Sequence, residues 1–290
     1  MREGNNHRPR AIASGVWASK WVLSAIIIGC AFVSGLRAQP LPLSHGERID
    51  YDLYFKWGVI MSKAGLATFS VRNASERVGS PWRYTLLFRS SGVVERFFPM
   101  RDTIDCHYSA DHRLLYSSKR TNDGDYYSVD ELDFNYGKDD IVAIHSLRYT
   151  LKATKIDTLL MSRNPVFDLL GATMHLRSLD WSALSYGAEF PFTVAIGRDL
   201  VNARFRYTGQ QIVEHQGFKY RTRHFYIDIY DEAFTQAKEA AEVWMGDDAN
   251  HIPVKVRAKL RIGAAEAYYR DSFNRQAPLS CRVAIGGGGK

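Results

Sequence analysis

The sequence is poor in cysteine and has none of the short motifs that mark common catalytic sites. Only three of its 290 residues are cysteine. It contains no H-E-x-x-H pattern for zinc, no G-x-S-x-G nucleophile elbow, no phosphate-binding glycine loop and no dinucleotide fingerprint. The nine histidines are scattered, and the adjacent Cys106 and His107 would point to opposite faces of a strand. We therefore expect no metal, no cofactor and no catalytic residue.

Clustered positive charge is also scarce once the first 38 residues are set aside. The whole chain has a formal net charge of +7. Five basic residues and one acidic residue lie within residues 1–38, so the remainder has a net charge of only +3. A nucleic-acid-binding protein shows clustered basic residues within a recognisable module. No such module is present, and nucleic acid is excluded as an expected partner.

Residues 1–38 have the order of a secretory signal. Basic residues precede an apolar run from Trp21 to Val33, and Leu36-Arg37-Ala38 ends on a small residue before Gln39-Pro40. The apolar run is shorter than the roughly 20 residues of a membrane-spanning helix. We expect cleavage near Ala38 and a periplasmic or cell-envelope protein.

Two alternatives to cleavage at Ala38 stay open. The segment can remain as an uncleaved membrane anchor. Ile27-Ile28-Gly29-Cys30 also resembles a lipobox, in which Cys30 would be lipidated and would attach the protein to a membrane. Ala31-Phe32-Val33 argues against this second alternative, because the chain stays apolar after the cysteine.

Two cysteines, Cys106 and Cys281, remain after cleavage. An oxidising compartment permits a disulfide between them. The alternative is a pair of separate buried thiols, and the sequence does not decide between the two.

The rest of the chain shows the alternation that is typical of β-strands. Between Ile49 and Trp57, apolar residues occupy every second position, and a comparable pattern runs from Val254 to Ile262. Asn122-Asp123-Gly124-Asp125 is a strong turn signal. Further strands are expected at 66–71, 84–90, 101–108, 114–120, 126–136, 189–196, 201–208, 211–214, 221–228 and 242–245. Residues 233–241 are expected to form a loop, with a short helix as the alternative.

One segment has helical spacing instead. Asn164 suits an N-cap and Pro165 the first helical position, and Phe167, Leu170, Met174 and Arg177 follow at helical intervals. Long meanders curl or close to protect their edges. We therefore expect a mainly β fold, a single strongly curved antiparallel sheet or open barrel, with one helix packed against it at about 165–178. The lead-in is 39–46, the single domain 47–275 and the flexible tail 276–290.

Several short pieces in a fixed order resemble a known family. They are Gly46-Glu47, Trp57-Gly58, Ala64-Gly65, Phe97-Phe98 before Arg101-Asp102, Phe167-Asp168-Leu169 leading to Arg177, and Val243–Asp248 before Ile252-Pro253-Val254. Together they resemble the uncharacterised bacterial exported domain-of-unknown-function family 3108, over roughly 41–268. The resemblance implies an exported β-rich protein with no agreed activity, with an architecture similar to the half-barrel lipoprotein carriers of the cell envelope.

The candidate site residues fall into two groups. Trp57 and Trp244 are candidates for lining a ligand cavity, and the stripe Lys255, Arg257, Lys259 and Arg261 for contacting an anionic group; the alternative for the stripe is a solvated strand face. The second group is expected to be structural, tying elements together: Arg101, Asp102, Asp168, Arg177, Asp247 and Asp248. Asp247 and Asp248 also fit ordinary turn chemistry.

Three functions remain on this basis. The first is non-catalytic binding or carriage of an apolar or amphipathic ligand, such as a lipid, because a curved sheet rich in aromatic residues can enclose one. The second is an envelope scaffold or assembly protein that contacts a protein partner through a sheet edge or the basic face. The third is a glycan hydrolase, which would need two carboxylates across a cleft.

Overall fold

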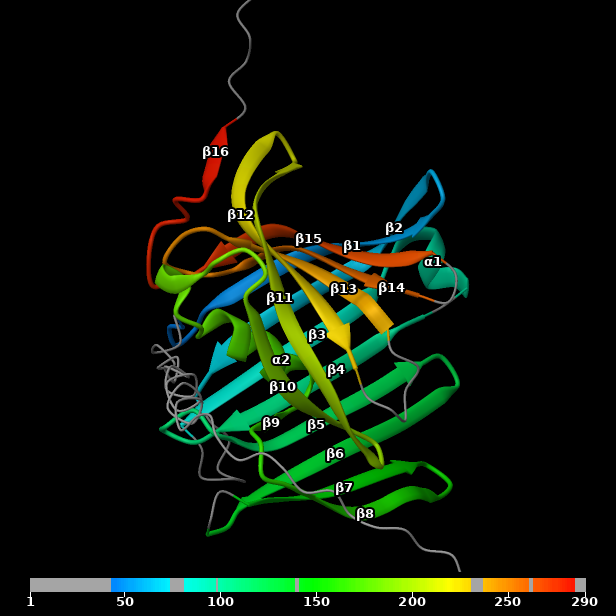
Figure 1. Cartoon of the computed structure of the whole chain (residues 1–290). Coiled ribbons are helices and arrows are strands. Elements are labelled where there is room, and N and C mark those ends of the chain that lie inside the picture. Colours follow the sequence, from blue (N-terminus) through cyan, green and yellow to red (C-terminus); the bar gives the residue numbers. More distant parts are fainter. Residues whose placement is uncertain are drawn as a thin grey trace, which may run out of the picture. The chain divides into compact units, whose positions relative to one another are not determined.

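The computed structural model describes residues 43–73, 81–97, 99–138, 141–230, 237–260 and 263–284 (Figure 1). The expected signal segment, Cys30 and Arg261 lie outside the described residues. The elements are β1 (Arg48–Trp57), β2 (Ile60–Arg72), β3 (Trp82–Ser90), α1 (Gly92–Phe97), β4 (Arg101–Tyr108), β5 (Leu114–Asp123), β6 (Tyr126–Tyr136), β7 (Val142–Thr150), β8 (Thr154–Ser162), β9 (Val166–Phe167), α2 (Leu169–Arg177), β10 (Glu189–Ile196), β11 (Asp199–His215), β12 (Phe218–Ile229), β13 (Ala237–Gly246), β14 (Pro253–Lys259), β15 (Ala264–Phe273) and β16 (Arg282–Ala284). In the described part of the chain, neither helix has the length and apolarity of a membrane span.

The strands form one sheet built from two meanders. Strands β1 to β8 pair in sequence order, strands β10 to β15 do the same, and β1 pairs with β15 to join the two runs. β16 adds to β12, and the two-residue β9 pairs with β10 in parallel. The sheet is therefore mixed, because the short β9–β10 pair interrupts an otherwise antiparallel arrangement.

This sheet is nearly closed into a barrel with an unsealed seam, as the alternation and strand number predict. The seam lies between the edge strands β8 and β9. Side chains cross it: Ser146 Oγ donates to the carbonyl oxygen of Gly197 at 2.6 Å, and Arg198 Nη2 donates to that of Lys155 at 3.1 Å. The turn between β10 and β11 is thus fastened to β7 and β8 without backbone pairing.

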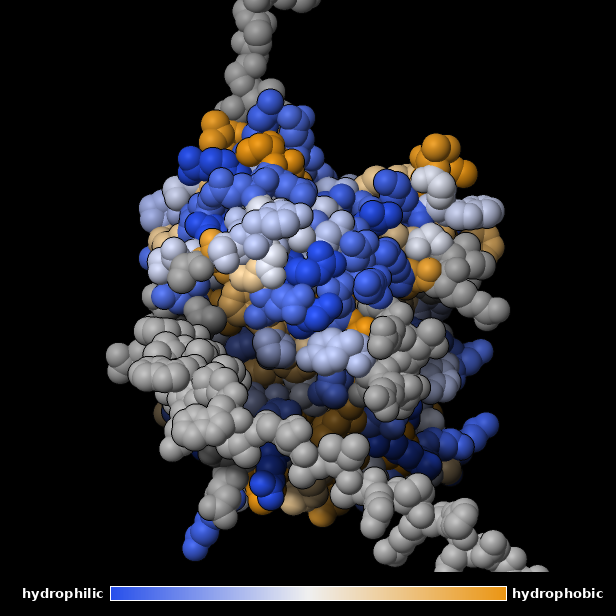
Figure 2. Space-filling view, in the orientation of Figure 1, coloured by the Kyte–Doolittle hydropathy of each residue, from blue (hydrophilic) through white to orange (hydrophobic). Residues whose placement is uncertain are grey.

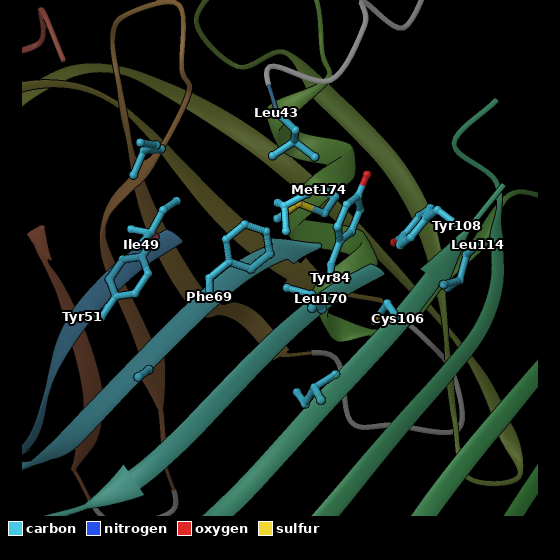
Figure 3. Close-up of a cluster of buried hydrophobic side chains, with 14 of the residues drawn as sticks. Leu43, Ile49, Tyr51, Phe69, Tyr84, Cys106, Tyr108, Leu114, Leu170 and Met174 are labelled. Carbon is cyan, nitrogen blue, oxygen red and sulfur yellow. The ribbon is translucent and has the colours of Figure 1, made fainter. Parts of the chain in front are cut away.

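Helix α2 lies between two apolar clusters. Its residues Leu170 and Met174 pack with residues from β1 to β7, such as Tyr84 (Figure 3). Ala172 and Leu176 pack into the second cluster, which comes largely from β10 to β13. A helix apolar on both sides is expected to be buried. α2 therefore connects the two apolar clusters.

The helix begins four residues later than the sequence suggests. Asn164 and Pro165 precede β9, in which Val166 and Phe167 pair with β10. Asp168 is the N-cap: its backbone is extended, and its side chain accepts from Gly171 N. The predicted N-cap at Asn164 is wrong because backbone pairing with β10 takes the first residues of the segment. Leu169, the first residue of the helix, is exposed.

Two further expectations need correction. Residues 237–241, expected as a loop or helix, form the first half of β13 and pair with β12. Of the tail expected at 276–290, the structure describes 276–284, where β16 pairs with β12 and Cys281 is buried. The domain therefore extends beyond residue 275.

Candidate ligand cavity

Neither candidate tryptophan lies on the two cavities described below. Trp57 ends β1 at the β1–β2 turn and is 61% exposed. Trp244 is buried in the core, and its Nε1 donates to Gln211 Oε1 at 2.7 Å. Trp244 of β13 is thus hydrogen-bonded to β11, which lies two strands away in the sheet. The candidate site described below is therefore built without these two residues.

The basic stripe on β14 is matched by carboxylates from the neighbouring strands. Arg257 Nη1 lies 3.1 Å from Glu242 Oε1, and its Nε lies 3.5 Å from Glu266 Oε1. Lys255 Nζ lies 3.6 Å from Glu266 Oε2, and burial lowers the pKa of this lysine. Lys259 Nζ is 3.7 Å from a carboxylate oxygen of Glu239. Within the described residues, the stripe is an ion-pair network and offers no cationic groove.

Arg101, Asp102, Asp247 and Asp248 hold strand ends and turns. Arg101 pairs with Glu95 of α1, and Asp102 Oδ1 accepts from the backbone N of Asn122 at 3.0 Å. Burial raises the pKa of Asp102. Asp247 Oδ1 lies 2.7 Å from Arg223 Nε. Asp248 accepts from the backbone N of Asn250 at 2.9 Å and from that of Cys281 at 3.2 Å.

Asp168 connects α2 to the first meander. Its Oδ1 accepts from Gly171 N at 2.6 Å, and its Oδ2 accepts from Ser117 Oγ at 2.6 Å and Cys106 Sγ at 2.9 Å. A carboxylate at a helix N-terminus also interacts favourably with the helix dipole. Asp168 therefore positions the helix against β4 and β5.

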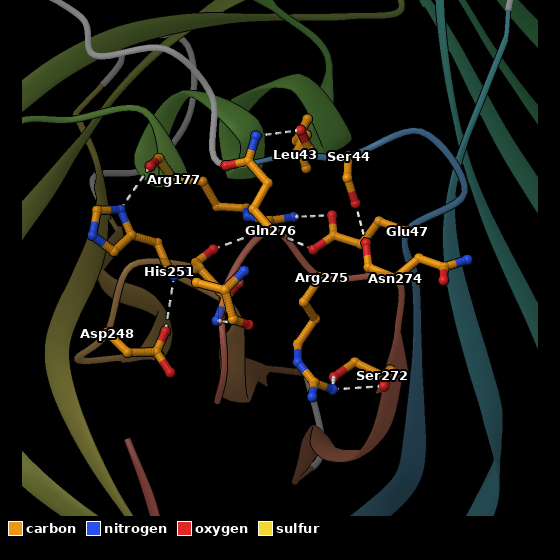
Figure 4. Close-up of polar contacts among 12 residues, drawn as sticks. Leu43, Ser44, Glu47, Arg177, Asp248, His251, Ser272, Asn274, Arg275 and Gln276 are labelled. Atoms are coloured by element: carbon orange, nitrogen blue, oxygen red, sulfur yellow. Dashed lines mark hydrogen bonds and ion pairs between the residues drawn. The ribbon is translucent and has the colours of Figure 1, made fainter. Parts of the chain in front are cut away.

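Arg177 fastens the other end of α2. Its guanidinium pairs with Glu47, and its Nη2 also donates to the carbonyl oxygen of Asn250 at 2.9 Å (Figure 4). His251 Nδ1 lies 2.8 Å from the carbonyl oxygen of Arg177. The C-terminus of the helix is thereby joined to the residue just before β1 and to the turn after β13.

The two cysteines are free, so the disulfide considered above is not formed. Cys106 contacts Asp168 inside the first meander, whereas Cys281 lies beside Gly246 in the second. Burial is the main cause that raises the pKa of each thiol, and a neighbouring aspartate adds to it. Both are separate buried thiols.

The main cavity lies where the β4–β5 turn, the β6–β7 turn and the segment after β8 meet α2. Its volume is about 750 Å³, and it opens to solvent. Small-molecule pockets occupy roughly 300–1,000 Å³. It is lined by Tyr108, Asp111, His112, Arg113, Tyr136, Gly137, Ile141, Val142, Arg163, Asn164, Pro165, Val166, Phe167, Gly171, Met174, His175 and Ser178.

The wall of this cavity is largely apolar and aromatic, whereas its rim carries cations. Val142, Val166 and Met174 are buried in the core and form part of the wall. Arg113 lies at the rim, with its Cζ 5.5 Å from the centroid of the Tyr136 ring. Its Nε also lies 2.9 Å from Asp111 Oδ2, with both side chains more than half exposed, so this pairing is weakened by solvent.

Arg163 provides the second cation of the rim. It is exposed, and no ion pair to it occurs among the described residues. Neither arginine stood out in the sequence, since each is an isolated residue in a connecting segment. Arg113 and Arg163 line the same cavity because the segment between β8 and β9 lies close to the β4–β5 turn.

The cavity histidines are poor sources of positive charge at neutral pH. His175 stacks on Phe167 with centroids 4.8 Å apart, and burial lowers its pKa to about 4. His112 Nδ1 lies 3.2 Å from Tyr84 Oη, and burial lowers its pKa too. No cluster of three or more metal-ligating side chains occurs in the described ranges. The chemistry of the site is thus an apolar interior below an arginine rim.

A second cavity, of about 130 Å³, lies inside the barrel near the seam. Lys119, Asp130 and Arg148 contribute to its wall, and Arg148 pairs with Asp130. A water molecule takes about 30 Å³ in the liquid, so this space suits a few waters rather than a lipid-sized molecule.

Comparisons with known proteins describe a family without an assigned activity. The family model described as "Protein of unknown function (DUF3108)" matches residues 50–270. A search of curated proteins finds no match. The crystal structure of a β-barrel-like protein of domain of unknown function DUF1849 from Brucella abortus is similar, with a TM-score of 0.51 at 10% identity. The similarity covers 79% of this chain and 97% of that chain, and at this identity it shows the fold alone.

Proposed function

The chain belongs to the DUF3108 family of proteins of unknown function, and we propose that it binds an amphipathic, anionic molecule in the cavity beside α2. The molecule has an apolar body, such as an acyl chain, and an acidic group at one end. The role is non-catalytic binding or carriage within the cell envelope.

The observation that best supports this proposal is the arrangement of side chains in the cavity of about 750 Å³. Val142, Val166 and Met174 offer an apolar surface in its interior, so an acyl chain placed there leaves water. Arg113 and Arg163 at the rim suit a carboxylate or phosphate, since a guanidinium binds these groups through two parallel hydrogen bonds.

The order of residues 1–38 supports the cellular setting of this proposal. A positive segment, an apolar run and a small residue before Gln39 are what an exported protein carries. Export places the chain next to membrane lipids and their breakdown products, which have the required chemistry.

Native mass spectrometry of the protein purified from the cells that export it is the first test. We expect a mass above that of the polypeptide, which returns to the polypeptide mass on denaturation, and an acidic lipid in the organic extract. A polypeptide mass without any adduct, together with failure to bind added fatty acid, would overturn the proposal.

Charge reversal at the rim tests the orientation of the ligand. A fluorescent long-chain fatty acid and its methyl ester are titrated into the wild type and the Arg113→Glu/Arg163→Glu variant. The variant should bind the acid at least about tenfold more weakly and the ester equally well. Arg270→Glu, at an exposed residue of β15, is the matched control. Equal loss of acid and ester would contradict an anion-binding rim.

A further inference from the structure

The turn between β1 and β2 presents an apolar tip to solvent. Trp57 and Ile60 form the last cross-strand pair, and only Gly58 and Val59 lie between them. Trp57 is 61% exposed, Ile60 62% and Val59 100%. Large apolar side chains grouped in this way on a soluble surface mark an interaction site.

Helix α1 adds to the same surface. Its start is bonded to β2, because Ser91 N donates to the carbonyl oxygen of Ala64 at 3.0 Å. Val93 and Phe97 of this helix are both exposed. Figure 1 shows the β1–β2 tip and α1 close together at the upper right, and Figure 2 shows an uncovered apolar tip in that place.

The sequence of side chains along the hairpin fits a bilayer surface. Val59 and Ile60 are at the apex, Trp57 is just behind them, and Lys56 and Lys63 lie further back on the two strands. Residues 55–63 contain no acidic residue. Tryptophan prefers the boundary between hydrocarbon and headgroups, and lysine reaches anionic headgroups while its stem stays in an apolar layer.

The basic charge behind the tip is only partly neutralised. Lys63 Nζ lies 2.7 Å from Asp52 Oδ1, but its side chain remains about half exposed. On α1, Glu95 is paired with Arg101, which leaves Arg96 exposed beside the two apolar residues. The surface thus combines protruding apolar side chains with a net positive charge, as interfacial membrane-binding segments do.

We propose that the β1–β2 tip and α1 form a membrane-docking surface, which inserts Trp57, Val59 and Ile60 into the interfacial layer of a bilayer containing anionic lipid. The docking surface is separate from the ligand cavity. The register of β1 to β4 places Trp57 at the opposite strand end from Tyr108, which lines the cavity. The inference therefore stands or falls independently of ligand binding.

The test uses the chain from Ala38 to Lys290, a compact unit that contains both apolar cores. It is mixed with vesicles of phosphatidylcholine and phosphatidylglycerol and sedimented. The Val59→Ser/Ile60→Ser variant should partition about tenfold more weakly than the wild type or worse, since it removes two apolar side chains from the bilayer. Both residues are mostly exposed, so the variant should fold normally. Tyr186→Ser removes an exposed aromatic residue outside this surface and should partition like the wild type.

Quenching by brominated phospholipid then locates the inserted residue. The chain from Ala38 to Lys290 has four of the six tryptophans, and the three besides Trp57 are buried or half-buried. The wild type should be quenched on vesicles and Trp57→Phe should not. Absence of vesicle binding by the wild type would overturn the proposal. Sedimentation of the Val59→Ser/Ile60→Ser variant with vesicles to the same extent as the wild type would also overturn it. So would a β1–β2 tip that joins two copies of the chain and does not bind vesicles.

Discussion

Arg177 and Glu47 are 130 residues apart in the chain and form a two-point ion pair from which solvent is fully excluded. The two N–O distances are 3.1 and 3.0 Å. Glu47 lies just before β1, and Arg177 is the last residue of α2. The pair holds the helix between the two meanders, so it also sets the position of one wall of the cavity.

Glu47→Gln should therefore destabilise the protein strongly. The substitution leaves the Arg177 guanidinium buried without its counter-charge, which typically costs about 3–5 kcal/mol. Urea unfolding followed by circular dichroism measures the change. The double variant Glu47→Leu/Arg177→Met removes both charges and should be more stable than Glu47→Gln. If Glu47→Gln unfolds at the wild-type urea concentration, the pair does not hold the helix.

Cys106 and Cys281 should react with thiol reagents only after unfolding. Both are buried, and the pKa of each thiol is raised, so little thiolate is present or accessible at neutral pH. Ellman's reagent should detect neither in the native chain from Ala38 and both in denaturant. The intact mass should not change on reduction. A mass increase of two hydrogens on reduction would show that the two are bridged.

The sequence was sufficient for the fold class, because alternation directly reports a strand with one buried face. The boundaries at 101–108, 126–136 and 189–196 coincide with β4, β6 and β10. The turn signal around Gly124 is also confirmed, with β5 and β6 on its two sides and a φ of 61° at the glycine. Strand alternation and turn residues depend on neighbouring positions in the chain, so the sequence is sufficient to predict them.

The cavity was not predictable, since it depends on contacts that are distant in the chain. Arg113 and Arg163 have no pattern that links them. The predicted start of the helix was wrong for a related reason: Val166 and Phe167 pair with β10, more than 20 residues later in the chain. The alternating cations of β14 were visible, but their acidic partners on β13 and β15 depend on strand pairing.

Arg257→Glu should lower the stability of the fold, because Arg257 belongs to the ion-pair network of β13, β14 and β15. Arg257 lies between Glu242 and Glu266, and the Glu266 side chain is nearly fully buried. Reversal places three carboxylates together and removes the charge-assisted hydrogen bond to Glu242, which is worth about 1.5–3 kcal/mol. The free energy of unfolding in urea should fall clearly below that of Lys259→Glu, whose lysine is about half exposed. Equal stability of both variants would argue against the network.

Stability should also fall on acidification, with His175 as one cause. Burial lowers its pKa from 6.5 to about 4, so the folded state releases a proton that the unfolded state retains between these values. The contribution of neutral His175 to the free energy of unfolding is fully present above the pKa of the unfolded state. It decreases as pH falls between the two pKa values and is lost below the pKa of the folded state. Partial contact with solvent in the cavity limits the loss to the order of 2 kcal/mol.

His175→Phe isolates this contribution, because the ring keeps its stacking on Phe167 while the proton site is removed. Other histidines, such as the buried His224 and the half-buried His251, also have a lowered pKa, so the wild type alone would not assign the effect to His175. Urea unfolding at about pH 7.5 and about pH 4.5 should show a smaller loss of stability in the variant than in the wild type. An equal loss in both proteins would mean that His175 is protonated as easily in the folded chain as in the unfolded one. In that case the cavity wall at His175 would be open to water, and the apolar site proposed for an acyl chain would have to lie deeper, against Met174.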